Sequence, residues 1–201
     1  MALQHLLVSS LFWSAVLSQV PAFNSSPATT NTSSSEACAS LHIIVVRASL
    51  EPPSQGVIGT LATLITGANP GSTVEWIAYP ATLDNYANSS SQGVAAATQR
   101  LMDYTDSCKG SQVVLLGYSQ GAQVVGDVLC GGGDPDVGLG PFTPPIAKNY
   151  SQSVIAMIQM GDPRHLVNKT YDVGSATKNG VSGAAFGVLR AGEKVWRLTQ
   201  L

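Results

Sequence analysis

The sequence carries little charge, and its basic residues do not cluster. Only 11% of the 201 residues are charged, compared with 44% hydrophobic residues, and the formal net charge is −2. Attraction to nucleic acid or to an anionic membrane surface depends on basic patches, so we expect neither as a partner. About 140 residues remain once the two ends are set aside, enough to bury one sizeable core but not two. We therefore expect one compact domain that is a monomer.

Cysteine and histidine are also scarce. The chain has three of each, with no Cys-x-x-Cys and no pair of histidines at ligand spacing, so we expect no metal site. Cys38 precedes the first predicted strand and Cys108 precedes a later one, so in a parallel sheet the two would lie side by side. In an oxidising compartment they would pair, and closing so long a loop would stabilise the fold by roughly 4 kcal/mol. Cys130 is left over, either as a buried thiol or as a cysteine that has lost its partner.

The N-terminal apolar run is too short to span a bilayer comfortably. It covers residues 6–20 and leads into Val20-Pro21-Ala22, which has the small-residue character of a cleavage site. We interpret residues 1–22 as a secretory signal peptide, although residues 1–5 contain no Lys or Arg. The alternative is a buried N-terminal helix.

Residues 23–37 are poor in apolar side chains. Ser, Thr, Asn, Pro and Ala dominate this stretch, which cannot bury enough apolar surface to order itself, so we expect a disordered linker. Glycosylation sequons of the form Asn-x-Ser/Thr begin at Asn24, Asn31, Asn88, Asn149 and Asn168. Behind a signal peptide, these sequons are typical of a secreted, extracellular glycoprotein.

What the chain does contain is a strand-like run that ends in Gly-x-Ser-x-Gly. The apolar, β-branched residues 112–118 lead into the sequence GYSQG at 117–121, and a helical stripe of valines follows at once. This arrangement predicts a nucleophile elbow, in which Ser119 sits on a sharp strand-to-helix turn and its hydroxyl is held clear of the sheet. The backbone N–H of Gln120 would then point to where an oxyanion forms. The alternative is a glycine-rich turn that happens to contain a serine.

The rest of the chain alternates between strand and helix patterns. Strands are predicted at residues 41–47, 74–79, 112–118 and 154–160, with helices at 55–66, at 90–107 and after the elbow. Such βαβ units predict an α/β fold with a parallel sheet. Ligand sites in these folds gather at the carboxyl ends of the strands. The polar residues that fall there are Arg47, Tyr79, Ser119 and Asp162.

Four blocks of sequence together resemble the cutinase and acetylxylan esterase family of secreted serine esterases. The blocks are HIIVVRASLEPPSQG at 42–56, GYSQG at 117–121, LCGGGDP at 129–135 and MGDP at 160–163. The resemblance covers about residues 38–180 and implies a three-layer, α/β-hydrolase-like sandwich with a small open parallel sheet. It also implies no cofactor and a site that cleaves carboxylic esters of plant polymers, either acetylated xylan or cutin.

The resemblance assigns roles to individual residues. Ser119 matches the family's nucleophile, Gln120 matches the residue whose backbone N–H forms part of the oxyanion hole, and Ser49 matches the hydroxyl that donates the second hydrogen bond. From the residues alone, Ser49 could equally be a loop serine that caps the following helix. Cys38 and Cys108 match a family disulfide.

The resemblance stops before the family's catalytic Asp and His, which we do not locate. Residues 181–201 contain no Asp, His or Cys, so we interpret them as an atypical tail outside a domain at 38–180. Because Val181-Ser182 can be encoded by GTGAGT, the usual start of an intron, the tail is hypothesised to be translated intron. A sheet without its last strand would leave an exposed edge, which could prevent stable folding.

The histidines present are poor substitutes for the missing base. His5 belongs to the signal peptide, and His42 falls near the amino end of a strand, as a core or sheet-face histidine would. His165 lies at the correct end of the sheet, but Asp162 is only three residues away, which favours a local turn contact over an oriented triad.

The sequence is therefore compatible with two functions. The first is a serine carboxylesterase, inactive in this form if no base is supplied, because a serine hydroxyl without a base is a weak nucleophile. The second is a non-catalytic secreted domain of the same fold that binds polysaccharide or cuticle.

Overall fold

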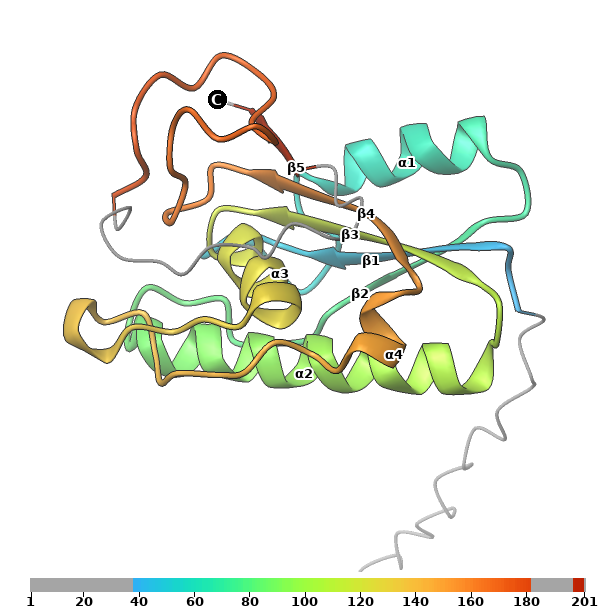
Figure 1. The fold of residues 1–201 in the computed structure, drawn as a ribbon, viewed down its shortest axis with the longest axis horizontal. Coiled ribbons are helices and arrows are strands. Elements are labelled where there is room, and N and C mark those ends of the chain that lie inside the picture. The colour runs from blue at the N-terminus through green and yellow to red at the C-terminus, as the bar shows by residue number, and fades with distance from the viewer. Residues whose placement is uncertain (1–37, 182–196, 201) are drawn as a thin grey trace, which may run out of the picture. The chain divides into compact units, whose positions relative to one another are not determined.

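A computed structural model describes residues 38–181 and 197–200 (Figure 1). The chain divides into two units, Met1–Glu36 and Ala37–Leu201, and every described residue belongs to the second. The proposed signal peptide, the linker and the sequons at Asn24 and Asn31 lie outside the described residues. Within the described part, no helix combines the length and the apolar character that crossing a bilayer requires.

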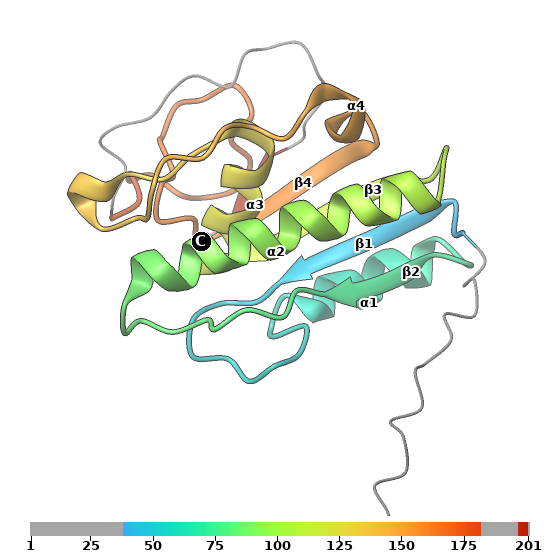
Figure 2. The same cartoon turned by 90° about the horizontal axis from the view of Figure 1, so that it is seen from below.

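The domain is built on a parallel sheet whose strands run in the order β2-β1-β3-β4-β5. The strands are β1 (Leu41–Val46), β2 (Thr73–Trp76), β3 (Gln112–Tyr118), β4 (Val154–Met160) and β5 (Arg197–Gln200). Helix α1 (Gly59–Ala68) covers one face, while α2 (Tyr86–Ser107) and α3 (Gln120–Cys130) cover the other (Figures 1 and 2). Two short helices, η1 (Pro135–Val137) and α4 (Lys148–Ser151), lie in the connection from α3 to β4. This is the predicted three-layer α/β sandwich with a small parallel sheet.

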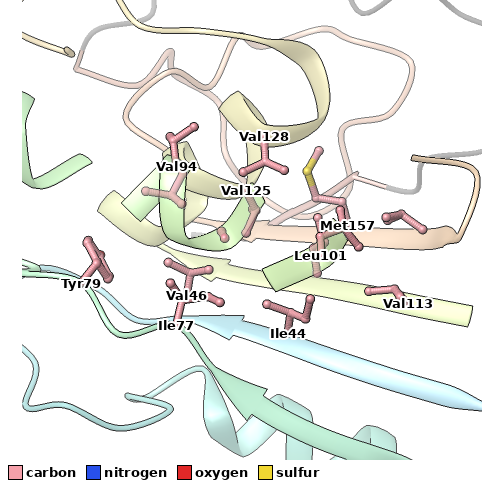
Figure 3. Close-up of a cluster of buried hydrophobic side chains, with 14 of the residues drawn as sticks. Ile44, Val46, Ile77, Tyr79, Val94, Leu101, Val113, Val125, Val128 and Met157 are labelled. Atoms are coloured by element: carbon pink, nitrogen blue, oxygen red, sulfur yellow. The ribbon is translucent and has the colours of Figure 1, made fainter. Parts of the chain in front are cut away.

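Alternate residues of the central strands face opposite layers of the core. Ile44 and Val46 of β1 pack with α2 and α3 (Figure 3), whereas Ile43 and Val45 pack under α1. Side chains in a strand alternate between faces, so a strand covered on both sides must be apolar throughout. The continuous apolar runs in the sequence are therefore a direct consequence of the two helical layers.

The disulfide between Cys38 and Cys108 is present, as expected. Its Cα atoms are 5.3 Å apart, and the bridge joins the segments that enter β1 and β3. These strands are neighbours in the sheet, and Gln112 N–H donates a hydrogen bond to the carbonyl of Ser40 beside the bridge. Cys130, at the end of α3, takes no part in this disulfide.

Three element boundaries differ from the prediction by three residues or more. Helix α2 begins at Tyr86 rather than at residue 90, because its first turn presents Ser89 and Ser90 to the interior and so lacks an apolar signal. Helix α1 begins at Gly59 rather than at residue 55, and β2 ends at Trp76 rather than at residue 79.

The prediction that the sheet lacks a last strand is wrong. Residues Arg197–Gln200 form β5, which pairs with β4 in parallel, with Met157 opposite Arg197 and Met160 opposite Gln200. The free N–H and C=O groups along the edge of β4 can pair with any extended segment that reaches them, whatever its side chains. Residues 182–196 and 201 of the tail lie outside the described residues.

Candidate active site

Ser119 occupies the turn between β3 and α3, as the nucleophile-elbow pattern predicts. Its backbone has φ 52° and ψ −117°, and α3 begins at the next residue. The Ser119 N–H donates to the carbonyl of Met160 at 2.8 Å, so the elbow is tied to the end of β4. The residue is partly exposed. Its hydroxyl is therefore held at the carboxyl end of the sheet, within reach of solvent.

Two glycines allow the elbow to pack this closely. A Cβ on Gly117 would overlap the backbone of Gly121, and a Cβ on Gly121 would overlap the carbonyl oxygen of Val46. The start of α3 therefore rests directly on β1 as well as on its own strand. Any side chain at either position would push Ser119 away from the sheet.

Gln120 fixes the first turn of α3. Its side chain is fully buried, accepts a hydrogen bond from Ser89 Oγ at 3.2 Å and donates to the carbonyl of Thr82 at 3.3 Å. As the first residue of the helix, Gln120 has no carbonyl one turn earlier to receive its own backbone N–H. The helix dipole also favours negative charge at this end. A fixed, available donor therefore lies beside the Ser119 hydroxyl.

Ser49 lies in the loop that follows β1, the neighbour of β3 in the sheet. Its Oγ is buried and makes no hydrogen bond within the described residues. The alternative that Ser49 caps the next helix is wrong, because α1 begins ten residues later with Ile58 at its N-cap. A buried hydroxyl with no partner is costly unless something else accepts its hydrogen bond.

The other predicted polar residues also gather at this end. Arg47 directly follows β1, and the Tyr79 hydroxyl donates to the Arg47 carbonyl at 2.7 Å. Burial raises the pKa of Tyr79, so its hydroxyl stays protonated and remains a donor. Asp162 follows β4 by two residues and is buried. The carboxyl ends of four neighbouring strands therefore meet at one site.

His165 makes the local turn contact with Asp162 that the sequence favours, because its backbone N–H donates to the Asp162 carbonyl at 3.0 Å, while its ring lies near another carboxylate. Asp172 Oδ1 is 3.8 Å from His165 Nδ1, and neither ring nitrogen makes a hydrogen bond within the described chain. Asp162 instead accepts hydrogen bonds from the Gln159 amide at 3.1 Å and from the Arg164 N–H at 2.9 Å. The ring of His165 is 5% exposed. His42 lies on the sheet face near the amino end of β1, as predicted, and takes no part in this site.

Sequence reasoning missed a buried ion pair near the elbow. Arg164, in the loop after β4, donates to Asp127 of α3, and Gln123 donates to the other oxygen of that carboxylate at 3.2 Å. Tyr86 of α2 donates to Gln123 Oε1 at 2.8 Å. Burial raises the pKa of Asp127 to about 6, although the guanidinium of Arg164 and the Gln123 hydrogen bond act in the opposite direction. A lone acidic residue in a helix gives no sequence signal of such a partner.

Known proteins share both the sequence and the fold of this chain. A family model described as Cutinase matches residues 37–185. The chain is 36% identical over 168 residues to Cutinase 11 of Verticillium dahliae and 36% identical over 172 residues to an acetylxylan esterase of Hypocrea jecorina. These matches cover 80% and 82% of this chain but 57% of each relative, so the chain spans less than two thirds of their length.

A solved structure is similar over nearly its whole length. The catalytic core domain of acetyl xylan esterase from Trichoderma reesei aligns with a TM-score of 0.74 and 34% identity, covering 82% of this chain and 84% of that one. A cutinase-like protein from Cryptococcus sp. aligns with a TM-score of 0.64 at 24% identity, which bears on the fold alone. From its matched residues, its fold and its relatives, this chain belongs to the cutinase family.

Proposed function

We propose that the protein is a carboxylic ester hydrolase in which Ser119 is the nucleophile. The observation that carries this proposal is the setting of Ser119 on a strained elbow, with the Gln120 N–H beside it. The Ser49 hydroxyl, which makes no hydrogen bond to the described residues, lies in the loop after the neighbouring strand β1. A structural serine requires none of these three features. Membership of a family whose relatives include a cutinase and an acetylxylan esterase supports the same conclusion.

In the proposed reaction, Ser119 Oγ attacks the ester carbonyl carbon and loses its proton to a base. The Gln120 N–H and the Ser49 hydroxyl donate hydrogen bonds to the carbonyl oxygen as negative charge develops on it. The C–O bond to the alcohol then breaks, the alcohol leaves with a proton, and water hydrolyses the acyl-enzyme to release the acid. Each oxyanion donor typically lowers the barrier by about 3 kcal/mol.

The base is the incomplete part of this site. The described residues hold two histidines, of which His42 lies toward the amino end of β1 and His165 is buried. Loss of a triad base generally lowers the rate by several powers of ten and leaves only what the oxyanion hole and substrate binding supply. We therefore expect this chain to hydrolyse esters slowly if no side chain acts as the base for Ser119.

The proposed substrates are acyl esters of plant polymers, either acetylated xylan or cutin. We further propose a secreted, glycosylated monomer that needs no cofactor, with a signal peptide at 1–22, a linker at 23–37 and the esterase domain at 38–180. The three sequon asparagines among the described residues, Asn88, Asn149 and Asn168, are all exposed and can accommodate a glycan.

Labelling with a serine-directed fluorophosphonate tests the proposal. We expect covalent labelling of the full chain, slow release of acetate from acetylated xylan or of fatty acid from cutin, and loss of both in Ser119→Ala. Thermal unfolding of the two proteins provides the control that the variant is folded.

If neither labelling nor ester turnover occurs, the esterase proposal is wrong. Retention of the same unlabelled protein on insoluble xylan or cutin would then favour the second function, a non-catalytic polysaccharide- or cuticle-binding domain. The observation that favours this second function is the absence of a triad base from the described part of the site.

A further inference from the structure

We propose that Arg47 and Glu51 are positioning residues that hold the Ser49 hydroxyl in place for the oxyanion. This inference rests on the proposed function, because it assigns Ser49 a role only in ester hydrolysis. Arg47, Ser49 and Glu51 all lie in the segment that joins β1 to α1. Neither Arg47 nor Glu51 has another role in the mechanism described above.

The Glu51 carboxylate ties the two limbs of this segment together. One oxygen, Oε2, accepts the backbone N–H of Ala48 at 2.6 Å, and the other, Oε1, accepts the backbone N–H of Val57 at 2.7 Å. A Cβ on Gly56 would overlap the carboxylate, so the segment closes tightly around it. Backbone hydrogen bonds to an ionised carboxylate are about twice as strong as those between neutral groups. The residue immediately before Ser49 is thereby fixed.

Arg47 holds the same segment from the sheet side. Arg47 is 3% exposed, and its guanidinium donates to the carbonyls of Glu51 at 3.0 Å, Ile77 at 3.3 Å and Tyr79 at 2.6 Å. It also lies 4.9 Å from the centre of the Tyr79 ring. Three carbonyl groups from two separate segments are bonded by one rigid, planar group. Arg47 therefore fixes the start of the loop relative to the residues that follow β2.

Ser49 lies between these two anchors and next to the elbow. Its neighbour Leu50 has φ 66° and donates its N–H to the carbonyl of Ala81 at 2.7 Å. A Cβ on Gly121 would come within 2.5 Å of the Arg47 carbonyl oxygen, so the anchored backbone lies against the start of α3. An oxyanion donor is effective only when it is already aimed at the developing charge. The contacts of Arg47 and Glu51 supply that fixed aim for a hydroxyl that makes no hydrogen bond to the part of the chain that the structure describes.

The first test measures the position of the loop without relying on catalysis. In Glu51→Gln the amide nitrogen would face a backbone N–H, so one of the two bonds is lost. The Leu50 N–H is bonded to the Ala81 carbonyl and not to the Glu51 side chain, and we expect hydrogen exchange at this amide to become about tenfold faster. The matched control is Glu75→Gln on strand β2. It removes a carboxylate that also has two partners, the side chains of His42 and Arg100. Unchanged Leu50 exchange in Glu51→Gln would overturn the inference.

The second test is a double-mutant cycle on ester turnover with Glu51→Gln, Ser49→Ala and the double variant. We expect Glu51→Gln to lower kcat about tenfold with little change in KM. In the Ser49→Ala background the same change should have no further effect, because the positioned group is already absent. Fully additive effects would overturn the inference. Arg47→Lys provides a second variant, with the same expected pattern, if Glu51→Gln fails to fold.

The two tests separate failure of the inference from failure of the proposed function. If the wild-type chain neither turns over esters nor reacts with the fluorophosphonate, the proposed function fails, and the assignment of Ser49 fails with it. If turnover is present and Leu50 exchange or the cycle gives the contrary result, only the roles of Arg47 and Glu51 are wrong.

Discussion

The buried side chain of His42 on β1 has a hydrogen-bond partner on β2 for each of its ring nitrogens. His42 Nδ1 lies 2.7 Å from Thr73 Oγ1, and its Nε2 lies 2.8 Å from Glu75 Oε1. The imidazole stacks on the ring of Tyr104 with a centroid distance of 3.7 Å. Arg100 donates to the second oxygen of Glu75. Each oxygen of the Glu75 carboxylate therefore has a side-chain partner.

The pKa of Glu75 leads to a prediction about stability. Burial alone would raise that pKa, but the hydrogen bonds from His42 and Arg100 outweigh it and bring the pKa below its ordinary value of 4.5. The unfolded chain therefore binds the proton more readily, so the stabilisation is present above that value and is lost as the pH falls through the lower folded pKa. Glu75→Gln should reduce the free energy of unfolding by roughly 1 kcal/mol at about pH 7 and by much less at about pH 3.

Urea denaturation of both proteins at the two pH values measures this difference. A destabilisation of the same size at both values would contradict the lowered pKa. Arg100→Ala gives a useful comparison, since it removes one of the two partners and leaves His42 in place.

The sequence indicates some residues of the candidate site and not others. Ser119 and Gln120 follow from a local pattern, because a strand, a Gly-x-Ser-x-Gly and a helix are consecutive in the chain. The resemblance points to Ser49 by position. The contacts of Arg47 with the carbonyls of Ile77 and Tyr79 join residues about 30 apart, as do many tertiary contacts, and no local pattern encodes them. The Arg164–Asp127 pair escaped prediction for the same reason.

At the level of elements, the first four strands and the three long helices were predictable, whereas β5, η1 and α4 were not. Strands β1, β3 and β4 are continuous apolar runs because helices cover both faces of the sheet. Strand β5 has four residues, and its existence depends on the open edge of β4 rather than on its own sequence. A pattern read along the chain contains no information about which edge is free.

Strand β5 gives a prediction about self-association. Thr199→Pro places a residue without an N–H in the middle of this strand and disrupts its pairing with β4, where Thr199 is opposite Gln159. The exposed edge of β4 can then pair with another copy of the chain. We expect light scattering to show concentration-dependent oligomers of Thr199→Pro.

Thr177→Pro is the matched control, because Thr177 is an exposed residue outside any helix or strand. It should scatter light as the wild-type chain does. A monomeric Thr199→Pro at the same concentrations would show that β5 is not needed to protect the edge.

At the level of the whole molecule, the covalent crosslink and the candidate site lie at opposite ends of the sheet. The Cys38–Cys108 bridge joins the segments that enter β1 and β3, whereas Ser49 and Ser119 follow the carboxyl ends of those same strands. The two strands pair along their whole shared length, from Leu41 opposite Gln112 to Val46 opposite Gly117. The crosslink therefore stabilises the strands that carry the site without touching it.

Removal of the bridge should lower stability and spare the site. The cysteines are 70 residues apart in sequence, and in the chain-entropy model a loop of this size is worth about 4 kcal/mol. We expect Cys38→Ser/Cys108→Ser to lose that amount in urea denaturation. Fluorophosphonate labelling of the folded variant at low temperature should match the wild-type rate. Altered labelling of a fully folded variant would show that the bridge also shapes the site.

The backbone conformation of Ser119 is one that a serine adopts only at a cost in free energy. A non-glycine residue at φ 52°, ψ −117° is held in a sparsely populated conformation at a cost of order 1–3 kcal/mol. Glycine would adopt the same dihedrals with little penalty, and position 119 is partly exposed, so packing does not require a larger side chain. Selection for folding alone would therefore favour glycine at this position. Serine at this position therefore costs free energy that glycine would not, and the proposed role of its hydroxyl as the nucleophile accounts for that cost.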